Sequence, residues 1–359
     1  MRERLRKARL RERLFPLAAI VLSVVILSLN LVACNTSKES KDDVDIVIGT
    51  ANGSLCLAAL HVAIDNGYFE EEFSKAGISW RVEEIDMSNI ADLVASKKID
   101  ASTQLAGSMI PQIDNGLEIT FTAGMHTGCT KVYSKSDSGI TSLSDLKGKK
   151  IGVPSLGDSS VVALKRALYD LGIDVSAANT EVEWVVYSLS DLPIALENGA
   201  IDAAALHDPV AYNAEQEYGF TKILDLSTDE KFANEYCCMS FVTNDLATNN
   251  PEAAAAYTRA ILKASAFVSA NPYEAAKLQI DNNQCSGDLE TNAYLLESYN
   301  YSPSVEAAKT TIVNAASELS RIGELKASDP SIFASKAFTK FDGVPDSYTY
   351  VDGEFIEKN

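Results

Sequence analysis

LVASKKIDA, at residues 93–101, recurs further along the chain as ALENGAIDA, at residues 195–203. Each stretch has the pattern of a helix end, a turn and then Ile-Asp-Ala entering a strand. The same order of elements precedes both stretches: an apolar strand, a helix that ends at a glycine, a second strand and a short helix. Because alternating strands and helices build parallel sheets, the sequence predicts an α/β fold with two similar βαβ-based lobes and largely parallel sheets.

The expected elements occupy matching positions in the two halves, and Gly67 and Gly172 supply the helix stops. In the first half we expect strands at 45–49 and 81–85 and helices at 54–66 and 89–96. In the second half we expect strands at 150–154 and 183–187 and helices at 159–171 and 192–197. Beyond Val242 the chain is predicted to be mostly helical to about residue 322. The aromatic tail, 341–355, is expected to pack on the body.

The first 33 residues have the features of a secretory signal. A basic segment precedes an uncharged apolar run from Phe15 to Ala33. The sequence Leu31-Val32-Ala33-Cys34 resembles a bacterial lipobox, which implies cleavage before Cys34 and attachment of lipid to that cysteine. Residues 34–44 are polar and are predicted to form a disordered tether. The alternative interpretation of the apolar run is an uncleaved membrane anchor.

Composition describes a large acidic protein. The chain has 359 residues, 46% of them hydrophobic, and a formal net charge of −19. Removal of residues 1–33, which carry a net charge of +5, leaves 326 residues with a charge of −24. That length allows two lobes with a large core, and the hydrophobic content excludes a disordered chain. The negative charge argues against a nucleic-acid partner.

Four stretches carry a resemblance to a known family: AALHVAIDNGYFE at 58–70, KKIDA at 97–101, SLSDLKGKKIGV at 142–153 and IDAAALHDP at 201–209. In these stretches the chain resembles the solute-binding proteins of ABC importers in the nitrate/sulfonate/taurine group. Those proteins have a two-lobed, type II periplasmic-binding fold. The resemblance covers residues 45–330, and the third stretch is shared by many type II binding proteins.

The resemblance implies two crossover strands between the lobes, at 126–134 and 236–242. Lobe one is then expected at 45–127 and 240–359, with the later part mostly helical, and lobe two at 128–239. The implied function is capture of a small solute between the lobes and its delivery to an ABC permease. The solute would be nitrate-, sulfonate- or taurine-like, or another organic compound containing nitrogen or sulfur. The protein is expected on the outer face of the cell membrane, held by lipid on Cys34, without a cofactor and without enzymatic activity.

Ligands of open α/β sheets bind beyond the carboxyl ends of the strands, which makes the loops there and the two crossings the candidate site. The candidate ligand-binding residues are Asn52, Ser54, Cys56, Gly107, Ser108, His126, Cys129, Ser155, Asp158, Ser159, His207, Asp208 and Cys237. Ser54 and Ser159 begin helices, whose free N–H groups suit a sulfonate, nitrate or carboxylate. They could equally be ordinary N-caps. Asp158 argues against a simple anion, since its own carboxylate can occupy the helix end.

Histidines and cysteines gather in these loops: His126, His207, Cys56, Cys129, Cys237 and Cys238. Such soft ligands suit a transition metal or a metal chelate, and thiolates could also contact a soft organic group. Two plainer interpretations remain open. Free cysteine often packs as a small buried hydrophobe. A disulfide such as Cys56–Cys129 is an alternative in an exported protein.

Other classes of function have weaker support. The chain lacks the H-E-x-x-H, G-x-S-x-G, G-x-G-x-x-G and G-K-[ST] motifs of common enzymes. A nucleophile pair of Cys129 with His126 or His207 has no evident third group to orient it. The fold family also resembles an enzyme of pyrimidine synthesis for thiamine, but the signal sequence disfavours a cytoplasmic role. A sensory or adhesive lipoprotein is disfavoured because the sequence shows no signalling stalk.

Overall fold

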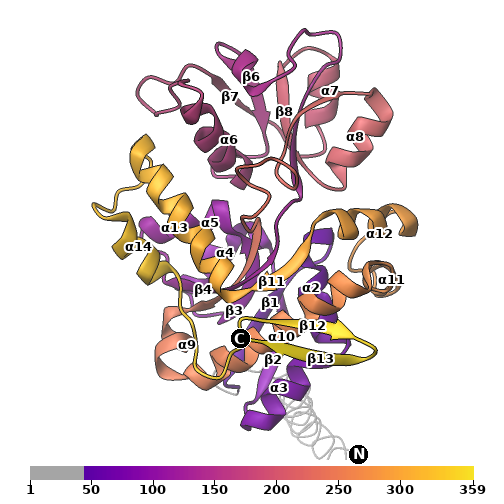
Figure 1. The fold of residues 1–359 in the computed structure, drawn as a ribbon, viewed down its shortest axis with the longest axis vertical. Coiled ribbons are helices and arrows are strands. Elements are labelled where there is room, and N and C mark those ends of the chain that lie inside the picture. Colours follow the sequence, from indigo (N-terminus) through magenta and orange to yellow (C-terminus); the bar gives the residue numbers. More distant parts are fainter. Residues whose placement is uncertain (1–43) are drawn as a thin grey trace, which may run out of the picture. The chain divides into compact units, whose positions relative to one another are not determined.

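Two mixed β-sheets organise residues 44–359, the part of the chain that the computed structural model describes (Figure 1). The predicted signal sequence, the lipid attachment at Cys34 and most of the tether lie outside the described residues. The first sheet has the order β11-β4-β10-β3-β1-β2 and consists of β1 Ile46–Thr50, β2 Trp80–Glu84, β3 Ala101–Leu105, β4 Ile119–His126, β10 Cys238–Thr243 and β11 Tyr301–Ser304. The second has the order β7-β6-β8-β5-β9 and consists of β5 Thr130–Ser134, β6 Lys150–Val153, β7 Glu183–Val186, β8 Ala203–His207 and β9 Thr221–Asp225.

The repeated Ile-Asp-Ala stretch performs the same task in both sheets. In the first sheet Asp100 accepts a hydrogen bond from the Val47 N–H at 2.9 Å, and Ala101 pairs with Ile48. In the second sheet Asp202 accepts one from the Lys150 N–H at 2.8 Å, while Ala203 pairs with Ile151. Each aspartate thus fastens the third parallel strand of its lobe to the first. The prediction of two similar βαβ-based lobes is confirmed.

Because these two aspartates differ in burial, we expect their replacement to lower the free energy of unfolding by different amounts. Asp100 is buried, whereas Asp202 is half-buried. Asp100→Ala would leave a backbone N–H without its partner in a dry core, which costs about 1–3 kcal/mol. Asp202→Ala is expected to cost less, because water can replace the lost carboxylate. Urea unfolding of both variants checks this, and equal losses would contradict it.

The strands that cross between the lobes run antiparallel to their neighbours. β10 is antiparallel to both β3 and β4, and β5 is antiparallel to both β8 and β9. Parallel pairing is found within β1–β2–β3 and within β6–β7–β8. The expectation of largely parallel sheets therefore holds for the repeated units and is wrong for the crossing strands. Strands β5 and β10 each enter their sheet from the other lobe. They therefore run in the direction opposite to the strands of the repeated units.

Helices cover both faces of the sheets. The α-helices are α2 Ala58–Asp65, α3 Tyr68–Ala76, α4 Ile90–Ala95, α5 Ala106–Asp114, α6 Ser159–Asp170, α7 Leu192–Glu197, α8 Val210–Tyr218, α9 Asn244–Asn249, α10 Pro251–Ala270, α11 Pro272–Asp281, α12 Leu289–Ser298, α13 Val305–Ile322 and α14 Pro330–Ala337. Short 3-10 turns are η2 Leu55–Leu57, η3 Met87–Asn89 and η4 Leu143–Leu146. The predicted helices at 159–171 and 192–197 are confirmed. That at 54–66 divides into η2 and α2.

The side chains of strand β8 alternate between two hydrophobic cores. Successive residues of a strand point to opposite faces. Ala203 and Ala205 join the core that includes α6, whereas Ala204 and Leu206 join a second core beneath α7 and α8. Figure 1 shows α6 on one side of this sheet and α7 and α8 on the other. The alternation places the next residue, His207, on the α6 side.

The tail packs on the body as predicted, in a form that the sequence did not suggest. Residues Ser347–Val351 and Glu354–Lys358 form the antiparallel hairpin β12–β13. Phe355 contacts Tyr68 of α3 with ring centroids 5.1 Å apart, and Tyr350 contacts Phe267 of α10 at 5.2 Å. These aromatic contacts fasten the hairpin to the first lobe.

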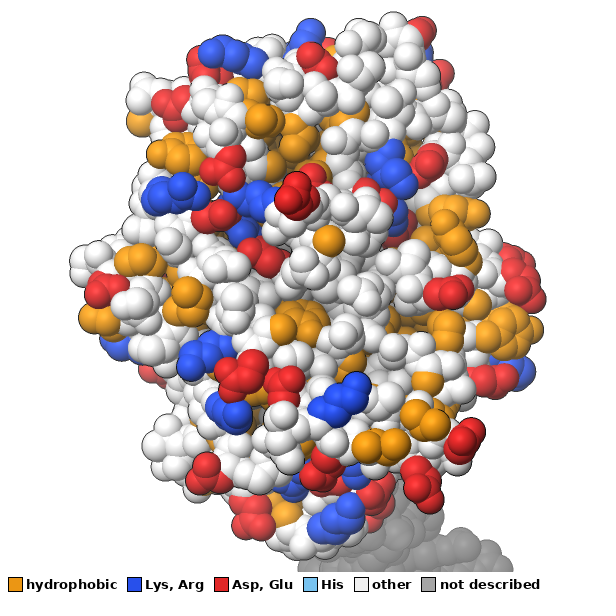
Figure 2. Space-filling view, in the orientation of Figure 1, with side chains coloured by type: hydrophobic (Ala, Val, Ile, Leu, Met, Phe, Trp, Pro, Cys, Tyr) orange, Lys and Arg blue, Asp and Glu red, His pale blue; other side chains and the backbone are white. Residues whose placement is uncertain are grey.

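The visible surface carries charges of both signs. Figure 2 shows Lys and Arg interspersed with Asp and Glu over the visible face. Among residues 44–359, no helix is both long enough and apolar enough to cross a bilayer.

Candidate functional site

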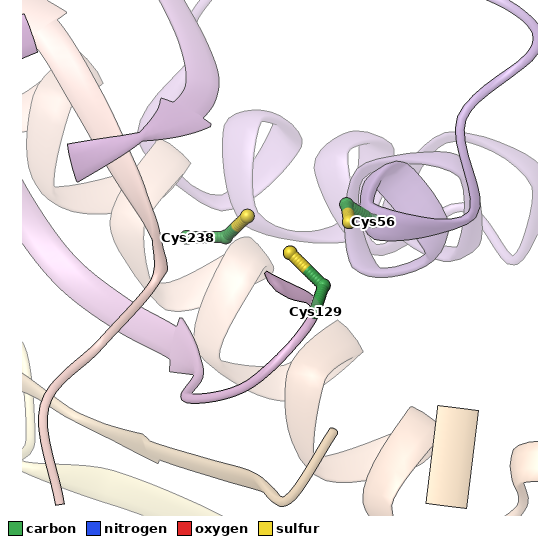
Figure 3. A group of neighbouring side chains, drawn as sticks. All are labelled: Cys56, Cys129 and Cys238. Atoms are coloured by element: carbon green, nitrogen blue, oxygen red, sulfur yellow. The ribbon is translucent and has the colours of Figure 1, made fainter. Parts of the chain in front are cut away.

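Four cysteine thiols converge where the chain crosses between the lobes. The sulfur atoms of Cys56, Cys129 and Cys238 all lie within 4.8 Å of one another. Figure 3 shows the Cys129 and Cys238 thiols pointing toward each other, with Cys56 on the neighbouring helical segment. The Cys237 sulfur lies 3.3 Å from that of Cys129. All of these thiols are free, so the Cys56–Cys129 disulfide considered above is not formed.

The thiols influence one another's acidity. Thiol hydrogen bonds from Cys129 and Cys238 lower the pKa of Cys56 to about 5. The hydrogen bond with Cys129 has the opposite effect on Cys237 and raises its pKa to about 12. The cluster therefore holds a thiolate on Cys56, and Cys237 stays protonated at neutral pH.

A histidine–carboxylate pair lies beside the thiols. His207 Nε2 is 2.9 Å from the Asp158 carboxylate, and its Nδ1 is 2.9 Å from the Thr130 hydroxyl. Burial lowers the pKa of His207, but the charge of Asp158 outweighs burial and leaves this pKa well above its usual value. For Asp158, burial raises the pKa, yet His207 and Ser160 bring it below its usual range. The pair is therefore ionised and nearly neutral overall.

This arrangement predicts that the His207 ring stays protonated at pH 7, whereas the His61 ring is neutral. Burial lowers the pKa of His61, which has no carboxylate within hydrogen-bonding distance. Asp158→Asn should bring the pKa of His207 down, since burial then acts unopposed. Ring-nitrogen NMR during a pH titration checks both histidines. Because the folded-state pKa of His207 is raised, the stability that protonation of this ring contributes is fully present below pH 6.5 and is lost as the pH rises through the folded pKa. A neutral His207 at pH 7 would refute the prediction.

Asp208 belongs to a second buried pair. It forms an ion pair with Lys131 of β5 and accepts a hydrogen bond from the Tyr212 N–H at 3.1 Å. Burial raises the pKa of Asp208 despite its lysine partner. The pair ties β8 and α8 to the crossing strand β5, so Asp208 supports the lobe from the side away from α6.

Two helix N-termini from opposite lobes face each other across the site. A Cβ atom on Gly107, in the first turn of α5, would lie 3.1 Å from the Ser159 Cβ in the first turn of α6. The Ser159 hydroxyl is buried and has no hydrogen-bond partner in the described part of the chain. A cavity of about 50 Å³ adjoins both residues and also contacts Tyr236 and Cys237. Small-molecule pockets are several times larger, so a solute requires the lobes to separate here.

Contacts on both flanks hold the lobes together in this state. Arg166 of α6 bonds to Glu318 of α13 at 2.5 Å and to Glu235 at 2.7 Å. On the other flank the rings of Tyr212 of α8 and Tyr294 of α12 lie against each other at a tilt, with centroids 5.6 Å apart. Glu318 and Tyr294 belong to the helical part that follows the second crossing.

The other candidate residues have different surroundings. His126 is buried against the rings of Tyr299 and Tyr301, and neither of its ring nitrogens has a partner among the described residues. Ser108 donates to the Leu105 carbonyl in the first turn of α5. The remaining three are Ser54, which makes no side-chain cap, and Asn52 and Ser155, which are exposed. Among residues 44–359, no hydrogen bond or ion pair joins Asn52, Ser54 or Ser155 to the thiols or to the His207 pair.

Several residues of the site escaped prediction. Thr130 and Lys131 hold His207 and Asp208, yet an isolated Thr-Lys in a strand gives no sign of these contacts. Arg166 looks like an ordinary surface residue of an amphipathic helix. Neighbouring residues within a strand point to opposite faces, but Cys237 precedes β10, which begins at Cys238. The alternation therefore does not apply to this pair, and both thiols lie near Cys129.

Comparison with known proteins finds a matching family and several relatives of this chain. The family described as NMT1/THI5-like matches residues 56–275. The arginine-binding extracellular protein ArtP of Bacillus subtilis is 30% identical over 38% of this chain, and the match spans about half of ArtP, 49%. The yeast 4-amino-5-hydroxymethyl-2-methylpyrimidine phosphate synthase THI11, from Saccharomyces cerevisiae, is 26% identical over 66% of this chain and 70% of its own length.

Solved structures agree on the fold. The periplasmic aliphatic sulphonate-binding protein SsuA of Escherichia coli superposes with a TM-score of 0.65 and 16% identity, over 82% of this chain and 96% of SsuA. The predicted two-lobed periplasmic-binding fold, and with it the resemblance to the nitrate/sulfonate/taurine group, is confirmed. The family match extends from the cysteine in η2 into α11 and so includes both crossings and all of the second sheet. This chain belongs to the NMT1/THI5-like family.

Proposed function

We propose that this protein is an extracytoplasmic solute-binding lipoprotein that captures a small solute between its lobes and delivers it to an ABC permease. The observation that carries the proposal is the meeting of α5 and α6 from opposite lobes, with the buried Ser159 hydroxyl free to donate. Two facing helix N-termini offer N–H groups and positive dipole ends to an acceptor group of a solute. The lobes would comprise residues 45–127 with 240–359, and residues 128–239.

The charges around α6 favour an organic solute over a free inorganic anion. Asp158 already caps this helix through the Ser160 N–H at 2.8 Å. A nitrate ion at the same end would meet that carboxylate, whereas a polar organic molecule can place one acceptor atom on Ser159 and the rest elsewhere. We therefore propose a compound that contains nitrogen or sulfur and carries a carbonyl, sulfonate or carboxylate group. ArtP and SsuA, which are described as binding arginine and aliphatic sulphonates, fit this class.

The test is ligand-induced stabilisation of the full-length protein in detergent. Aliphatic sulfonates, nitrate, pyrimidines and amino-acid analogues are screened for a rise in unfolding temperature, and hits are measured by calorimetry. A ligand at 100 times its Kd stabilises the protein by about 2.7 kcal/mol. Gly107→Leu should abolish the effect, because its side chain would occupy the contact with Ser159. Gly157→Ala, where no atom lies within 4 Å of the new Cβ, is the control. No response to any compound, or an unchanged response in Gly107→Leu, would contradict the proposal.

Attachment through Cys34 is tested separately. Cys34→Ser should abolish labelling of the protein by a radioactive or clickable fatty acid in bacterial cells. It should also prevent removal of residues 1–33 by lipoprotein signal peptidase, so the chain would migrate at its full length. Processing and labelling that persist in Cys34→Ser would rule out this anchor.

A second candidate function follows from the relationship to THI11. That relative is a pyrimidine phosphate synthase, and it matches two thirds of this chain. A synthase activity would use the thiols and His207 as reacting groups. Formation of a pyrimidine phosphate by the purified wild-type protein, lost in Cys129→Ala, would favour this candidate over solute delivery. The absence of product in the wild-type protein would eliminate it.

A further inference from the structure

Packing alone does not explain why three thiols converge. Cys56 lies in η2, Cys129 in the first crossing and Cys238 at the start of β10, and these segments are far apart in the sequence. A cysteine that merely fills space needs no particular direction for its sulfur. Here three sulfur atoms from three segments approach within 4.8 Å of one another, and the sulfur of Cys237 lies next to them (Figure 3).

The distances suit a shared metal ion. Zinc–sulfur bonds of about 2.3 Å place the sulfurs of a tetrahedral site about 3.8 Å apart. Sulfur atoms already within 4.8 Å reach that spacing through small side-chain rotations. A disulfide, by contrast, uses two thiols and leaves the third without a role.

The donor set selects the kind of metal. The three converging groups are all thiols, and no carboxylate or imidazole belongs to the group. Both nitrogens of His207 are engaged, by Thr130 and by Asp158. Thiolates select soft cations such as Cu⁺ and Zn²⁺ and disfavour Mg²⁺ and Ca²⁺, which prefer oxygen.

We propose that Cys56, Cys129 and Cys238 bind one thiophilic d10 cation, Cu⁺ or Zn²⁺, at the crossing between the lobes. On binding, the thiols that are still protonated lose their protons to solvent and three metal–sulfur bonds form, with no change of oxidation state. Cu⁺ is satisfied by three sulfurs, whereas Zn²⁺ takes a fourth ligand, for which Cys237 is the nearest protein thiol. The inference goes beyond solute capture, because the site needs no solute.

Such an ion would join η2 of the first lobe to both crossing segments. Those segments must flex when the lobes open, since they are the connections between the two sheets. A bound ion would therefore restrain opening and stabilise the folded protein in proportion to its concentration.

The test uses the full-length protein in detergent, reduced and then freed of reductant without oxygen. Zn²⁺ and Cu⁺ are titrated separately against a chromophoric competing chelator. One ion per chain is expected, with a rise in unfolding temperature and a thiolate-to-copper absorption band for Cu⁺. Cys56→Ser, Cys129→Ser and Cys238→Ser should each weaken binding by roughly 100-fold or more, because structural zinc sites draw their affinity from deprotonated thiols.

Cys285→Ser is the matched control. Cys285 is also buried, but its thiol donates to the Ser286 carbonyl and lies outside the group of three. Its replacement should destabilise the metal-free protein comparably and leave metal affinity unchanged. Equal affinity in Cys129→Ser and Cys285→Ser would overturn the proposal, as would failure of the wild-type protein to bind either ion. Where Cys129→Ser does not fold, the half-buried Cys56→Ser provides the same comparison. Solute binding lost in Gly107→Leu with metal binding intact would show that the two sites fail independently.

Discussion

Replacement of Glu72 by alanine is expected to lower the free energy of unfolding by about 3–5 kcal/mol. Glu72 of α3 is buried and bonds to two cations of α10, Lys263 at 2.5 Å and Arg259 at 2.6 Å. Lys263 is itself buried. Without the carboxylate, that ammonium group would remain in a dry environment with the partly exposed Glu71 as its remaining carboxylate partner. Urea unfolding of the variant and of the wild-type protein measures the loss.

Glu71 provides the matched control. It lies next to Glu72 and bonds to Lys75 and Lys263, but nearly half of its side chain is exposed. Exposed ion pairs contribute roughly 0–1 kcal/mol, so Glu71→Gln should have a small effect. Similar losses in the Glu71 and Glu72 variants would show that burial does not govern the strength of this cluster.

The same carboxylate predicts acid sensitivity. Burial raises the pKa of Glu72, but hydrogen bonds from Lys263 and Arg259 outweigh it and hold this pKa at about 2, against 4.5 for a free glutamate. Because the folded-state pKa is depressed, the resulting stability is present above pH 4.5 and is lost as the pH falls toward 2. The difference corresponds to roughly 3 kcal/mol. Glu72→Gln should therefore flatten the fall in stability between pH 4.5 and 2, and an unchanged slope would contradict the assignment.

Gly128→Ala is expected to destabilise the protein by about 3 kcal/mol or more, at or beyond the upper end of overpacking costs. A Cβ atom at Gly128 would lie 2.2 Å from the Ser227 Cβ and 2.5 Å from its Cα. The Ser227 backbone cannot easily move away, because Asp225 accepts a hydrogen bond from the Ser227 N–H at 3.0 Å. Gly128 itself lies in the first crossing, beside Cys129. The new methyl group therefore must displace either the crossing or the end of β9.

Gly157→Ala is again the control, because its Cβ would enter open space. That variant should stay within about 0.5 kcal/mol of the wild-type protein. Thermal and urea unfolding of both alanine variants, at the same pH and salt, make the comparison. A Gly128→Ala protein as stable as the control would mean that the crossing accommodates the extra atom by moving.

The repeated units were predictable because their signals are local. The Ile-Asp-Ala stretches, the glycine that ends α6 and the apolar spacing of Val161, Leu164 and Leu168 each lie within a few residues of what they specify. The antiparallel placement of β5 and β10 was not predictable in this way, since it depends on which strand lies beside each in space. The β12–β13 hairpin was also missed, because its aromatic residues pack on α3 and α10 rather than on each other alone.

In the candidate site, too, some features were predictable from the sequence and others were not. Sequence reasoning brought Cys129, Cys237, Asp158 and His207 to one region, because the carboxyl ends of strands share an edge of the sheet. Contacts among them depend on side-chain direction, which the strand pattern does not give for Cys237 because it lies outside β10. Asn52 and Ser155 follow strands as well, but their loops carry them into solvent.

Strand β10 also sets an order in which the two sheets can be completed. β10 lies between β3 and β4 in the first sheet, yet its partner in β3, Leu105, precedes Cys238 by the entire second lobe. A chain synthesised from its amino end can complete β6, β7 and β8 while the first sheet still lacks its central strand. Until β10 arrives, β3 has an unpaired edge. Such an edge can pair with other chains and lead to aggregation. The lobe that contains the first sheet is therefore the last to finish folding.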